Sequence, residues 1–458
     1  MKVIITGAGE VGHTLGEKLS SEEHDVTIIE PNPARAREIM EELDVQVIES
    51  SATDPSILRK AGIENADLLV CVADKDEVNI TASLIAQAYG KRKLQKIARI
   101  RNMGMVTDYK MSARKFLPVD FIINPELVAV DRIIDAVRFP QVTEIVRFSG
   151  GRIALAEIEI GKEHWAIGKT IAEINEMKSM PVLIAMAEEN GKLLVPGGGF
   201  QLKEGVKLHL IARIGDLGGV LKKLTGKGST YRDVMVAGGT YFGELIAAKL
   251  SEEGIRVKLI ESDRKKAFRL ADALSGVLVL NGDTTDTELL AEEGIESCDL
   301  FVSVTDDDEV NVVSSLIAVK SGASRTVTLI KNGRLATRLA KVDLGMIISP
   351  RLVAVDHILH FISHGRLFSV SNIEGSTDIN VLEFDIKSSN NLCGLTLREI
   401  KFPPLTLIGA VIRDEKDYIP DGNFKLEPSD RILVFTASNS IVELETLMES
   451  HGSTVTRR

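Results

Sequence analysis

The sequence has little of what several protein classes require. Of its 458 residues only three are cysteine and one is tryptophan, and aromatic residues make up 4%. Three widely separated cysteines (Cys71, Cys298 and Cys393) do not make a disulfide framework or a zinc site. No stretch approaches the roughly 18 uncharged apolar residues of a membrane-spanning helix. The N-terminal run reaches Gly7 too early for the apolar region of a signal peptide. We therefore expect a soluble, cytosolic protein.

The sequence also has fewer positively charged than negatively charged residues. Lys plus Arg number 55 and Asp plus Glu number 66, so the formal net charge is −11. Binding to nucleic acid depends on clustered Lys and Arg, and binding to an anionic membrane surface depends on a polybasic segment. The sequence has no basic tract, so we expect no nucleic-acid partner. Its 44% hydrophobic and 26% charged residues are typical of a globular protein. Its length is sufficient for two to four domains.

The second half of the sequence restates the first at a spacing of about 231 residues. The run Asp76–Asn79 recurs as Asp308–Asn311, and Pro125–Asp131 reappears with one change as Pro350–Asp356. Matching runs of this length indicate a tandem duplication, in which the second copy has lost a few loop residues.

Within each copy, short β-branched runs alternate with helical stretches. In the first copy the predicted strands are residues 3–6, 25–30, 45–49, 68–72, 96–100 and 121–124. The segments with apolar residues at helical spacing are 11–21, 34–43, 56–61 and 77–89. This alternation predicts a parallel sheet covered on both faces. The helix after Pro125 has an apolar face so wide that it needs a packing partner on more than one side.

The expected fold class is therefore α/β, a tandem duplication of a Rossmann-like doubly wound parallel-sheet domain, each followed by a small α+β lobe. The expected boundaries are 1–123 for the first Rossmann-like domain, 124–140 for its following helix, 141–225 for the first small lobe, 226–231 for a linker, 232–348 for the second Rossmann-like domain, 349–366 for its helix, 367–450 for the second small lobe and 451–458 for a tail.

A glycine-rich loop follows the first predicted strand. The residues Gly7, Ala8, Gly9, Glu10, Val11 and Gly12 form a G-x-G-x-x-G directly before a helix. In this context the first glycine permits a tight turn, the second lets the backbone approach a pyrophosphate, and the third packs helix on strand. Glu30 closes the second strand, where a carboxylate accepts hydrogen bonds from ribose hydroxyls and repels a 2′-phosphate. The pattern predicts a site for NAD(H) or plain adenine nucleotides such as ATP and ADP rather than NADP(H).

The second copy has a degraded version of this loop. Its residues are Gly238, Gly239, Thr240, Tyr241, Phe242 and Gly243, with threonine in place of the middle glycine. A β-branched residue there narrows the phosphate approach and resists unusual backbone angles. Glu261 matches Glu30, and Asp283 and Thr284 follow the third strand. We predict nucleotide binding at this copy too, with a different affinity or ligand.

Other lining residues follow from the fold, because ligands of such sheets sit at the carboxyl ends of the strands. Those expected are Thr53, Ala73, Asp74 and Arg99 in the first copy and Thr305 and Lys331 in the second. Arg99 is placed to reach a phosphate; the alternative is a surface salt bridge. Its counterpart is Leu329, which makes the second pocket less cationic, with Lys331 as a nearby substitute.

Residues that perform catalysis are not evident in either copy. A nicotinamide-dependent dehydrogenase needs a proton donor or a metal facing the cofactor. The histidines His357, His360 and His364 lie at helical spacing, but no Cys or carboxylate joins them, so a packed or solvated face is favoured over a metal site. The acidic run 306–309 is expected to cap a helix. We expect a protein with no catalytic residues and no metal.

Together these motifs resemble the regulator-of-potassium-conductance family. The resemblance rests on the repeated G-x-G-x-x-G lobes with an acidic residue at the end of the second strand, the D-E-x-N helix starts, the P-x-L-V-A-V-D helices and the small lobes with a P-x-G turn. The doubled order, over essentially residues 1–450, is similar to that of the regulatory subunits of Trk-type potassium uptake.

The resemblance implies a cytoplasmic protein attached peripherally to the inner face of the membrane through a partner. In this family, four double-length chains form a homotetrameric ring of eight lobes docked beneath a separate membrane potassium-channel subunit, here one of the Trk type. NAD(H), ATP and ADP bind the lobes and bias the ring between shapes that open or close the channel. The helices after Pro125 and Pro350 resemble the crossover helices that pair lobes at a flexible interface.

Two alternatives come from other classes. One is an NAD-dependent oxidoreductase, which would consume its cofactor and would not normally carry two unlike phosphate loops without a catalytic acid. The other is a redox-sensing transcription regulator, which would need a DNA-binding module and a basic surface. The charge of −11 opposes the second alternative.

Overall fold

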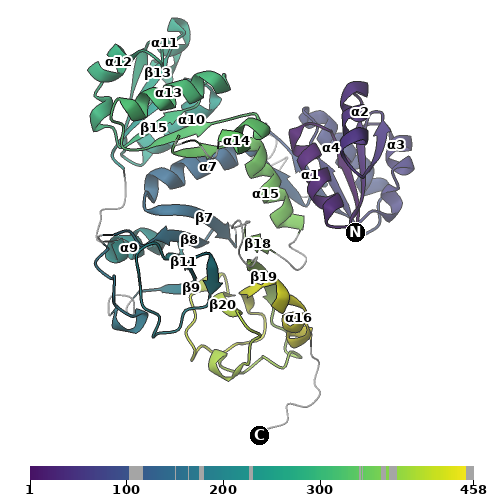
Figure 1. The fold of residues 1–458 in the computed structure, drawn as a ribbon. Coiled ribbons are helices and arrows are strands. Elements are labelled where there is room, and N and C mark those ends of the chain that lie inside the picture. The colour runs from purple at the N-terminus through teal and green to yellow at the C-terminus, as the bar shows by residue number, and fades with distance from the viewer. Residues whose placement is uncertain are drawn as a thin grey trace. The chain divides into compact units, whose positions relative to one another are not determined.

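The computed structural model describes residues 1–102, 117–149, 151–162, 164–174, 180–225, 231–339, 342, 344–362, 368–370 and 379–449 (Figure 1). The chain forms two compact units, Met1–Ile134 with Tyr231–Ile362 and Asp135–Thr230 with Ser363–Arg458. Each unit therefore draws on both copies of the repeat. The predicted linker residues 226–230 and the predicted tail 451–458 lie outside the described residues.

The first unit contains two six-stranded parallel sheets, one from each copy. The first has the strand order β3-β2-β1-β4-β5-β6, with strands β1 (Lys2–Thr6), β2 (Asp25–Glu30), β3 (Gln46–Glu49), β4 (Leu68–Cys71), β5 (Gln95–Arg99) and β6 (Phe121–Ile123). The second has the order β14-β13-β12-β15-β16-β17, with strands β12 (Asp233–Ala237), β13 (Arg256–Glu261), β14 (Val277–Asn281), β15 (Leu300–Ser303), β16 (Thr326–Leu329) and β17 (Met346–Ile348). The predicted doubly wound fold is confirmed. We call these two copies the first lobe and the second lobe.

Helices connect the strands of both lobes. Those of the first lobe are α1 (Glu10–Ser21), α2 (Pro33–Glu42), α3 (Pro55–Lys60), α4 (Asp76–Tyr89) and α7 (Pro125–Arg138). Those of the second lobe are α10 (Tyr241–Glu252), α11 (Arg264–Ala273), α12 (Thr287–Glu292), α13 (Asp308–Lys320), α14 (Gly333–Leu339) and α15 (Pro350–Ile362). Short 3-10 turns, η1 (Ile63–Asn65) and η3 (Ile295–Ser297), precede β4 and β15. In each sheet the strand order reverses between the first and fourth strands of the lobe, where α/β sheets bind ligands.

The repeated D-E-V-N run has a structural reason. Asn79 accepts a hydrogen bond from the Ala73 N–H at 2.9 Å and donates to the carbonyl oxygens of Ala73 and Arg99, both at 2.9 Å. Asn311 makes the same three bonds with Thr305 and Leu329. Each asparagine is fully buried and ties the end of one central strand to the next. These matched bonds also confirm that Leu329 is the counterpart of Arg99.

Helix α15, from the second copy, packs against the first lobe. Its residues Ala354, Val355 and Ile358 belong to the same buried cluster as strand and helix residues of the first lobe. Phe361 stacks on Phe121 of β6 with ring centroids 4.5 Å apart. Ion pairs join the two copies in both directions. Asp356 of α15 lies 3.9 Å from Lys18 of α1, and Asp131 of α7 lies 2.7 Å from Lys249 of α10. Helix α15 thus packs on a lobe of the other copy. The need for a second packing partner was predicted for the helix after Pro125, and for that helix it stays a prediction.

The second unit contains two five-stranded sheets whose paired strands run antiparallel. The first has the order β10-β9-β11-β8-β7, with strands β7 (Val142–Phe148), β8 (Ile153–Glu159), β9 (Val182–Glu189), β10 (Lys192–Leu194) and β11 (Lys207–Arg213), the turn η2 (Ile171–Glu173) and helix α9 (Ile214–Thr225). The second has the order β18-β19-β22-β20-β21, with strands β18 (Phe368–Val370), β19 (Ile379–Asp385), β20 (Leu407–Arg413), β21 (Lys416–Tyr418) and β22 (Arg431–Ala437), turns η5 (Leu397–Glu399) and η6 (Ser438–Ser440) and helix α16 (Ile441–Glu449).

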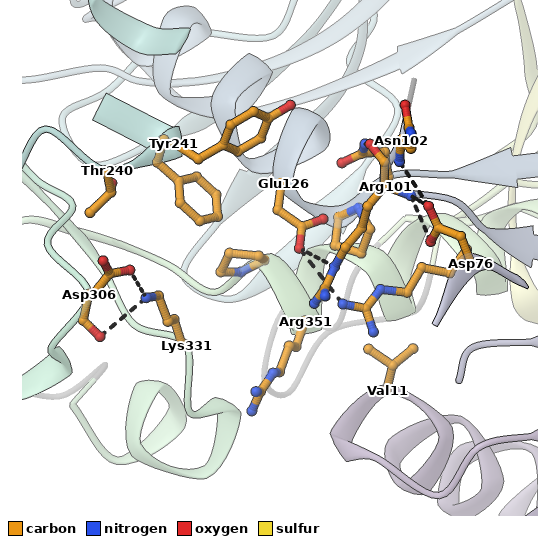
Figure 2. A pocket seen from close by; sticks show the side chains of 15 residues that line it. Val11, Asp76, Arg101, Asn102, Glu126, Thr240, Tyr241, Asp306, Lys331 and Arg351 are labelled. Atoms are coloured by element: carbon orange, nitrogen blue, oxygen red, sulfur yellow. Dashed lines mark hydrogen bonds and ion pairs between the residues drawn. The ribbon is translucent and has the colours of Figure 1, made fainter. Parts of the chain in front are cut away.

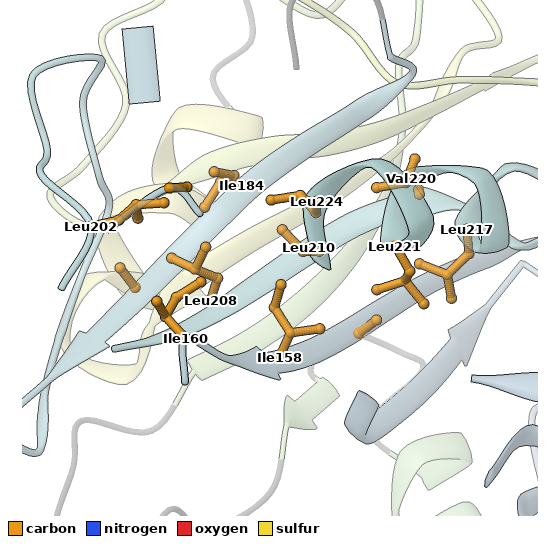
Figure 3. Packing of buried hydrophobic residues seen from close by; sticks show 14 of the residues in the cluster. Ile158, Ile160, Ile184, Leu202, Leu208, Leu210, Leu217, Val220, Leu221 and Leu224 are labelled. Carbon is orange, nitrogen blue, oxygen red and sulfur yellow. The ribbon is translucent and has the colours of Figure 1, made fainter. Parts of the chain in front are cut away.

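Helix α9 covers one face of the first small sheet. Its Leu217, Val220, Leu221 and Leu224 are buried in one cluster with β8, β9 and β11, as Figure 3 shows. Alternate residues of β8 take part in different clusters, because successive side chains of a strand point to opposite faces. The α+β prediction for these lobes is therefore confirmed.

Candidate functional site

The glycine-rich loop of the first lobe depends on two of its glycines for folding. Gly7 has φ +98°, and a Cβ there would lie 2.8 Å from the Ala73 Cα. Gly12 lies in the first turn of α1, and its Cβ would lie 1.9 Å from the Gly7 carbonyl oxygen. The first glycine makes the turn and the third lets helix and strand pack, as predicted from the motif.

Gly9 is different, because the space beside it is empty. A Cβ at Gly9 would meet no atom within 4 Å. Gly9 is the N-cap of α1, with φ −65° and ψ 179°, and no side chain caps the helix. The first N–H groups of α1 and the positive end of its dipole are therefore open to an anion.

Glu30 holds the loop in shape. Its carboxylate is 4% exposed and accepts the Ala8 N–H at 2.7 Å on one oxygen and the Asn32 N–H at 2.8 Å on the other. A carboxylate has about four acceptor positions, so capacity for ribose hydroxyls is left.

A cleft of about 310 Å³ lies beside this loop. It brings together five of the predicted residues with several neighbours: Gly7, Gly9, Glu30, Ala73 and Asp74, with Arg35, Ser51 and Lys75. Thr53 does not line it; its hydroxyl bonds that of Ser51 at 2.8 Å. The cleft is smaller than a whole dinucleotide needs, and it shares Gly9, Arg35 and Asp74 with a neighbouring cavity of about 610 Å³.

The loop of the second lobe is capped by its own threonine. The Thr240 hydroxyl accepts the Gly243 N–H at 3.4 Å and donates to the Val304 carbonyl at 2.6 Å. The side chain thus occupies the N-terminus of α10 that remains open in α1. The φ of Thr240 is −67°, close to the −65° of Gly9, so this position requires no unusual backbone angle and the predicted resistance of threonine has no effect here. What differs is the space and the free N–H, not the backbone.

The acid of the second lobe has more partners than Glu30. Glu261 accepts the Gly239 N–H at 3.1 Å and the Asp263 N–H at 2.8 Å, and Lys266 lies 3.1 Å from it. A Cβ at Gly239 would lie 2.4 Å from a methyl group of Leu270, so this side of the loop is filled.

The other predicted residues of the second lobe serve their own turns. Asp283 accepts the N–H and hydroxyl of Thr285, and these bonds hold the pKa of its carboxyl below the ordinary value. Thr284 is buried, and Thr305 bonds Asn311 and Asp307. Lys331 lies 2.8 Å from Asp306, so it does not stand free in the place of Arg99.

Arg99 lies outside the cleft and lines a larger cavity of about 850 Å³ within the first unit (Figure 2). In Figure 2, Val11 and Asp76 of the first lobe face Thr240, Tyr241 and Asp306 of the second across this space. We call it the interlobe cavity. Its lining includes four cationic side chains and three acidic ones: Arg99, Arg101, Lys331 and Arg351 with Asp76, Glu126 and Asp306.

Arg99 is held there by two acids. Its guanidinium lies 3.6 Å from Asp74 and 3.7 Å from Glu126, which also bonds Arg101 at 2.9 Å. Burial, followed by the positive charge of Arg101, lowers the pKa of Arg99 below its ordinary value. The Arg99 Nε and one Glu126 oxygen are buried without a hydrogen-bond partner among the described residues. A buried cation beside a second positive charge favours an anion next to it, and here Asp74 and Glu126 supply that negative charge.

Glu10 and Arg351 were not singled out together by the sequence. The Glu10 carboxylate accepts the Gly333 N–H at 3.0 Å and pairs with Arg351 at the start of α15. Glu10 was expected to line the phosphate site of its own lobe, and it lines the 610 Å³ cavity while it bonds the second lobe. Sequence could not have shown this contact, because it depends on how the copies pack.

The remaining expectations concern metals, caps and membranes. Asp307 is the N-cap of α13, as predicted for the acidic run. Burial lowers the pKa of His357 to about 4; nothing is described of the side chain of His360, and His364 lies outside the described residues. Within the described ranges, no three His, Cys, Asp or Glu residues are placed to share a metal ion. Over the same ranges no helix has the length and apolar character needed to cross a bilayer.

Family models match most of the chain. The TrkA-N domain model matches residues 3–125 and 234–350, and the TrkA-C domain model matches residues 381–449. The boundaries of the matched segments agree with the two parallel sheets and with the second small lobe.

Curated proteins are similar to this chain over nearly its whole length. The chain is 31% identical over 438 residues to the Trk system potassium uptake protein TrkA of Halomonas elongata, covering 95% of both proteins. It is 31% identical over 445 residues to a TrkA homolog of Archaeoglobus fulgidus, covering 97% of this chain and 99% of the homolog. A structure of the GsuK channel bound to NAD shares the fold, with a TM-score of 0.61 at 18% identity over 97% of this chain and 78% of that one.

The doubled lobe order, the two family models and the full-length similarity agree. The resemblance to the regulator-of-potassium-conductance family drawn from the motifs is thereby confirmed at the level of the family. This chain belongs to the TrkA family.

Proposed function

We propose that this chain is the cytosolic regulatory subunit of a Trk-type potassium-uptake system and that its first lobe senses NAD(H) or an adenine nucleotide. The TrkA family is regulatory and not enzymatic, which removes the oxidoreductase alternative. The relatives are named as potassium-uptake proteins of the Trk system, which supports a membrane channel subunit as the partner.

The observation that carries the proposal is the open N-terminus of α1. Gly9 leaves it uncapped, and Glu30 lies at the position where a carboxylate reads a ribose. The phosphates would meet the α1 N–H groups while the adenosine half occupies the cleft of about 310 Å³. A related fold, that of the GsuK channel, has been solved with NAD bound, which is consistent with this placement.

Gating then needs no bond-making. A nucleotide that binds two arrangements of the lobes with different affinities shifts their populations by that difference. A homotetrameric ring of eight lobes would add these small biases into one response. Docking beneath the membrane subunit would place the protein at the inner face of the membrane.

The proposal is tested by titrating the protein with NADH, NADPH, NAD, ADP and ATP in a calorimeter. We expect saturable binding without consumption of the cofactor, and weaker binding of NADPH because Glu30 repels its 2′-phosphate. Equal affinity for NADH and NADPH, or no binding, would refute the sensing site. Potassium flux into vesicles that contain a Trk-type channel subunit tests the partner, since flux should respond to the added protein and to its nucleotide.

A further inference from the structure

Glu10 joins the phosphate loop of the first lobe to a helix of the second copy. It is the first residue of α1, directly after Gly9, yet its carboxylate bonds the Gly333 N–H at 3.0 Å and pairs with Arg351 at the start of α15. Residues Ala354, Val355 and Ile358 of the same helix lie in the core of the first lobe. The phosphate loop of the first lobe and helix α15 of the second copy are therefore linked by both charge and packing.

The Glu10–Arg351 pair borders the place where a phosphate would lie. Gly9, Glu10, Arg99 and Arg351 all line the cavity of about 610 Å³ that adjoins the nucleotide cleft. A phosphate at the N-terminus of α1 would stand beside the negative Glu10, and this repulsion opposes binding unless a cation lies between them. Arg99 is 9% exposed and held by two acids, whereas the Arg351 side chain is 45% exposed and has room to turn.

We infer that a ligand phosphate takes Arg351 from Glu10, so that the second copy supplies an anion-binding residue to the first lobe. This inference rests on the proposed function, because it requires a nucleotide in the first lobe. A guanidinium binds a phosphate through two parallel hydrogen bonds, and a phosphate carries more negative charge than a carboxylate. Loss of the Glu10–Arg351 pair removes an ion pair between the loop and the first turn of α15, so that occupancy of the loop changes how that helix is held. The phosphate-bearing part of the nucleotide, not its base, is then the part that signals.

The test compares adenosine, AMP and ADP on the whole protein by calorimetry. For the wild type, affinity should rise with each added phosphate. In Arg351→Gln the affinity for ADP should fall by about tenfold or more, while the affinity for adenosine stays unchanged. In Glu10→Gln, which keeps an acceptor for the Gly333 N–H, ADP should bind several-fold tighter because the repulsion is removed.

Arg334→Gln is the matched control. Arg334 is also an arginine of the second copy that lines the same cavity, but it pairs with Glu38 at 3.6 Å and Glu42 at 3.2 Å on α2. It should leave the preference for ADP over adenosine unchanged. If Arg351→Gln keeps the wild-type preference, or lowers adenosine and ADP affinity equally, Arg351 is only a structural partner of Glu10 and the inference is overturned. If the wild type binds NADH but none of these three ligands, this inference fails alone. If it does not bind NADH either, the proposed function fails and this inference fails with it.

Discussion

The two glycine-rich loops have nearly the same backbone and opposite surfaces. Gly9 and Thr240 both lie in extended conformation at the N-cap, with φ of −65° and −67°. Beside Gly9 there is open space and an uncapped helix, whereas the Thr240 hydroxyl bonds the helix and the Val304 carbonyl. One hydroxyl and one methyl group thus separate a helix end that can receive a phosphate from one that is already satisfied. Duplication kept the fold of the loop and allowed its chemistry to diverge.

The same comparison extends to the acids behind the loops. Glu30 and Glu261 make the same two backbone bonds, but Glu261 also lies 3.1 Å from Lys266. A cation already paired with the acid weakens its attraction for further donors. The difference teaches that a retained acid can be structural, because it closes the loop whether or not a ribose is present.

The largest expected effect concerns what the two loops share. Gly12→Ala and Gly243→Ala each place a Cβ 1.9 Å from the carbonyl oxygen of the first glycine of the loop, Gly7 or Gly238. Each should lower the free energy of unfolding by about 3 kcal/mol or more through overpacking against the backbone. Urea denaturation of both variants checks this. A large loss in one lobe with none in the other would break the structural equivalence of the loops.

The next effect distinguishes the helices that follow the sheets, where His357 of α15 stands at the position of Arg132 in α7. Burial, followed by the charge of Arg132, lowers the pKa of His357 to about 4, while Asp131 opposes the shift. A lowered histidine pKa means that the unfolded chain binds the proton more tightly. The contribution of the neutral His357 side chain to stability is therefore fully present above pH 6.5 and is lost as the pH falls toward 4.

The loss from His357 should be at most about 3.5 kcal/mol, because its pKa is lowered by about 2.5 and each pKa unit corresponds to about 1.4 kcal/mol. Thermal unfolding between pH 7 and pH 4 should show a shallower decline for His357→Gln than for the wild type. The same decline in both proteins would show that His357 titrates normally. Burial raises the pKa of the Asp356 carboxyl, so its contribution to stability changes with pH in the opposite direction. The pH dependence of Asp356→Asn measures that contribution separately.

Gly9→Thr would convert the first loop into the second. Because no atom lies within 4 Å of a Cβ at Gly9, and its φ suits any residue, the variant should fold with wild-type stability. Its hydroxyl should cap α1 and weaken nucleotide binding by about 2 kcal/mol, roughly thirtyfold. Gly9→Ala is the control, since it adds bulk without a hydroxyl and should bind more tightly than Gly9→Thr. Calorimetry with NADH measures both, and unchanged affinity in Gly9→Thr would show that the loop does not hold the phosphates.

The smallest effect comes from the reverse change. Thr240→Gly removes the cap of α10 at a cost of a few tenths of a kcal/mol, because glycine is itself tolerated at this position. It should also add weak nucleotide binding at the second lobe, limited by Leu270 and by the Lys266–Glu261 pair. Titration of the double variant Gly9→Thr/Thr240→Gly isolates this site. A variant that gains no binding would mean that Leu270 and Lys266 close the second loop without help from Thr240.

Much of this fold could be predicted from the sequence, because its signals are local. Strand and helix periods, the glycines Gly7 and Gly12, and the acids at the ends of β2 and β13 all follow from spacing along the chain. The duplicated runs added the domain order. The repeated asparagines Asn79 and Asn311 were visible as a motif, although their role as strand ties needed the structure.

The interactions across the lobes could not be predicted in this way. Glu10 looked like a residue of its own phosphate loop, and its bonds to Gly333 and Arg351 arise from the packing of α15 on the first lobe. Arg99 was correctly placed at the end of β5, but its ion pair with Glu126 of α7 depends on the turn of that helix. The predicted roles of the site residues in binding remain predictions, as do the domain boundaries.

The central claim is that the first loop is open and the second is closed by Thr240. The most direct test is the number of NADH molecules that one chain binds tightly, measured by calorimetry on the wild type and on Gly9→Thr. The account predicts one tight site per chain in the wild type and none in the variant. Two sites of equal affinity in the wild type, or one tight site that survives in Gly9→Thr, would contradict it.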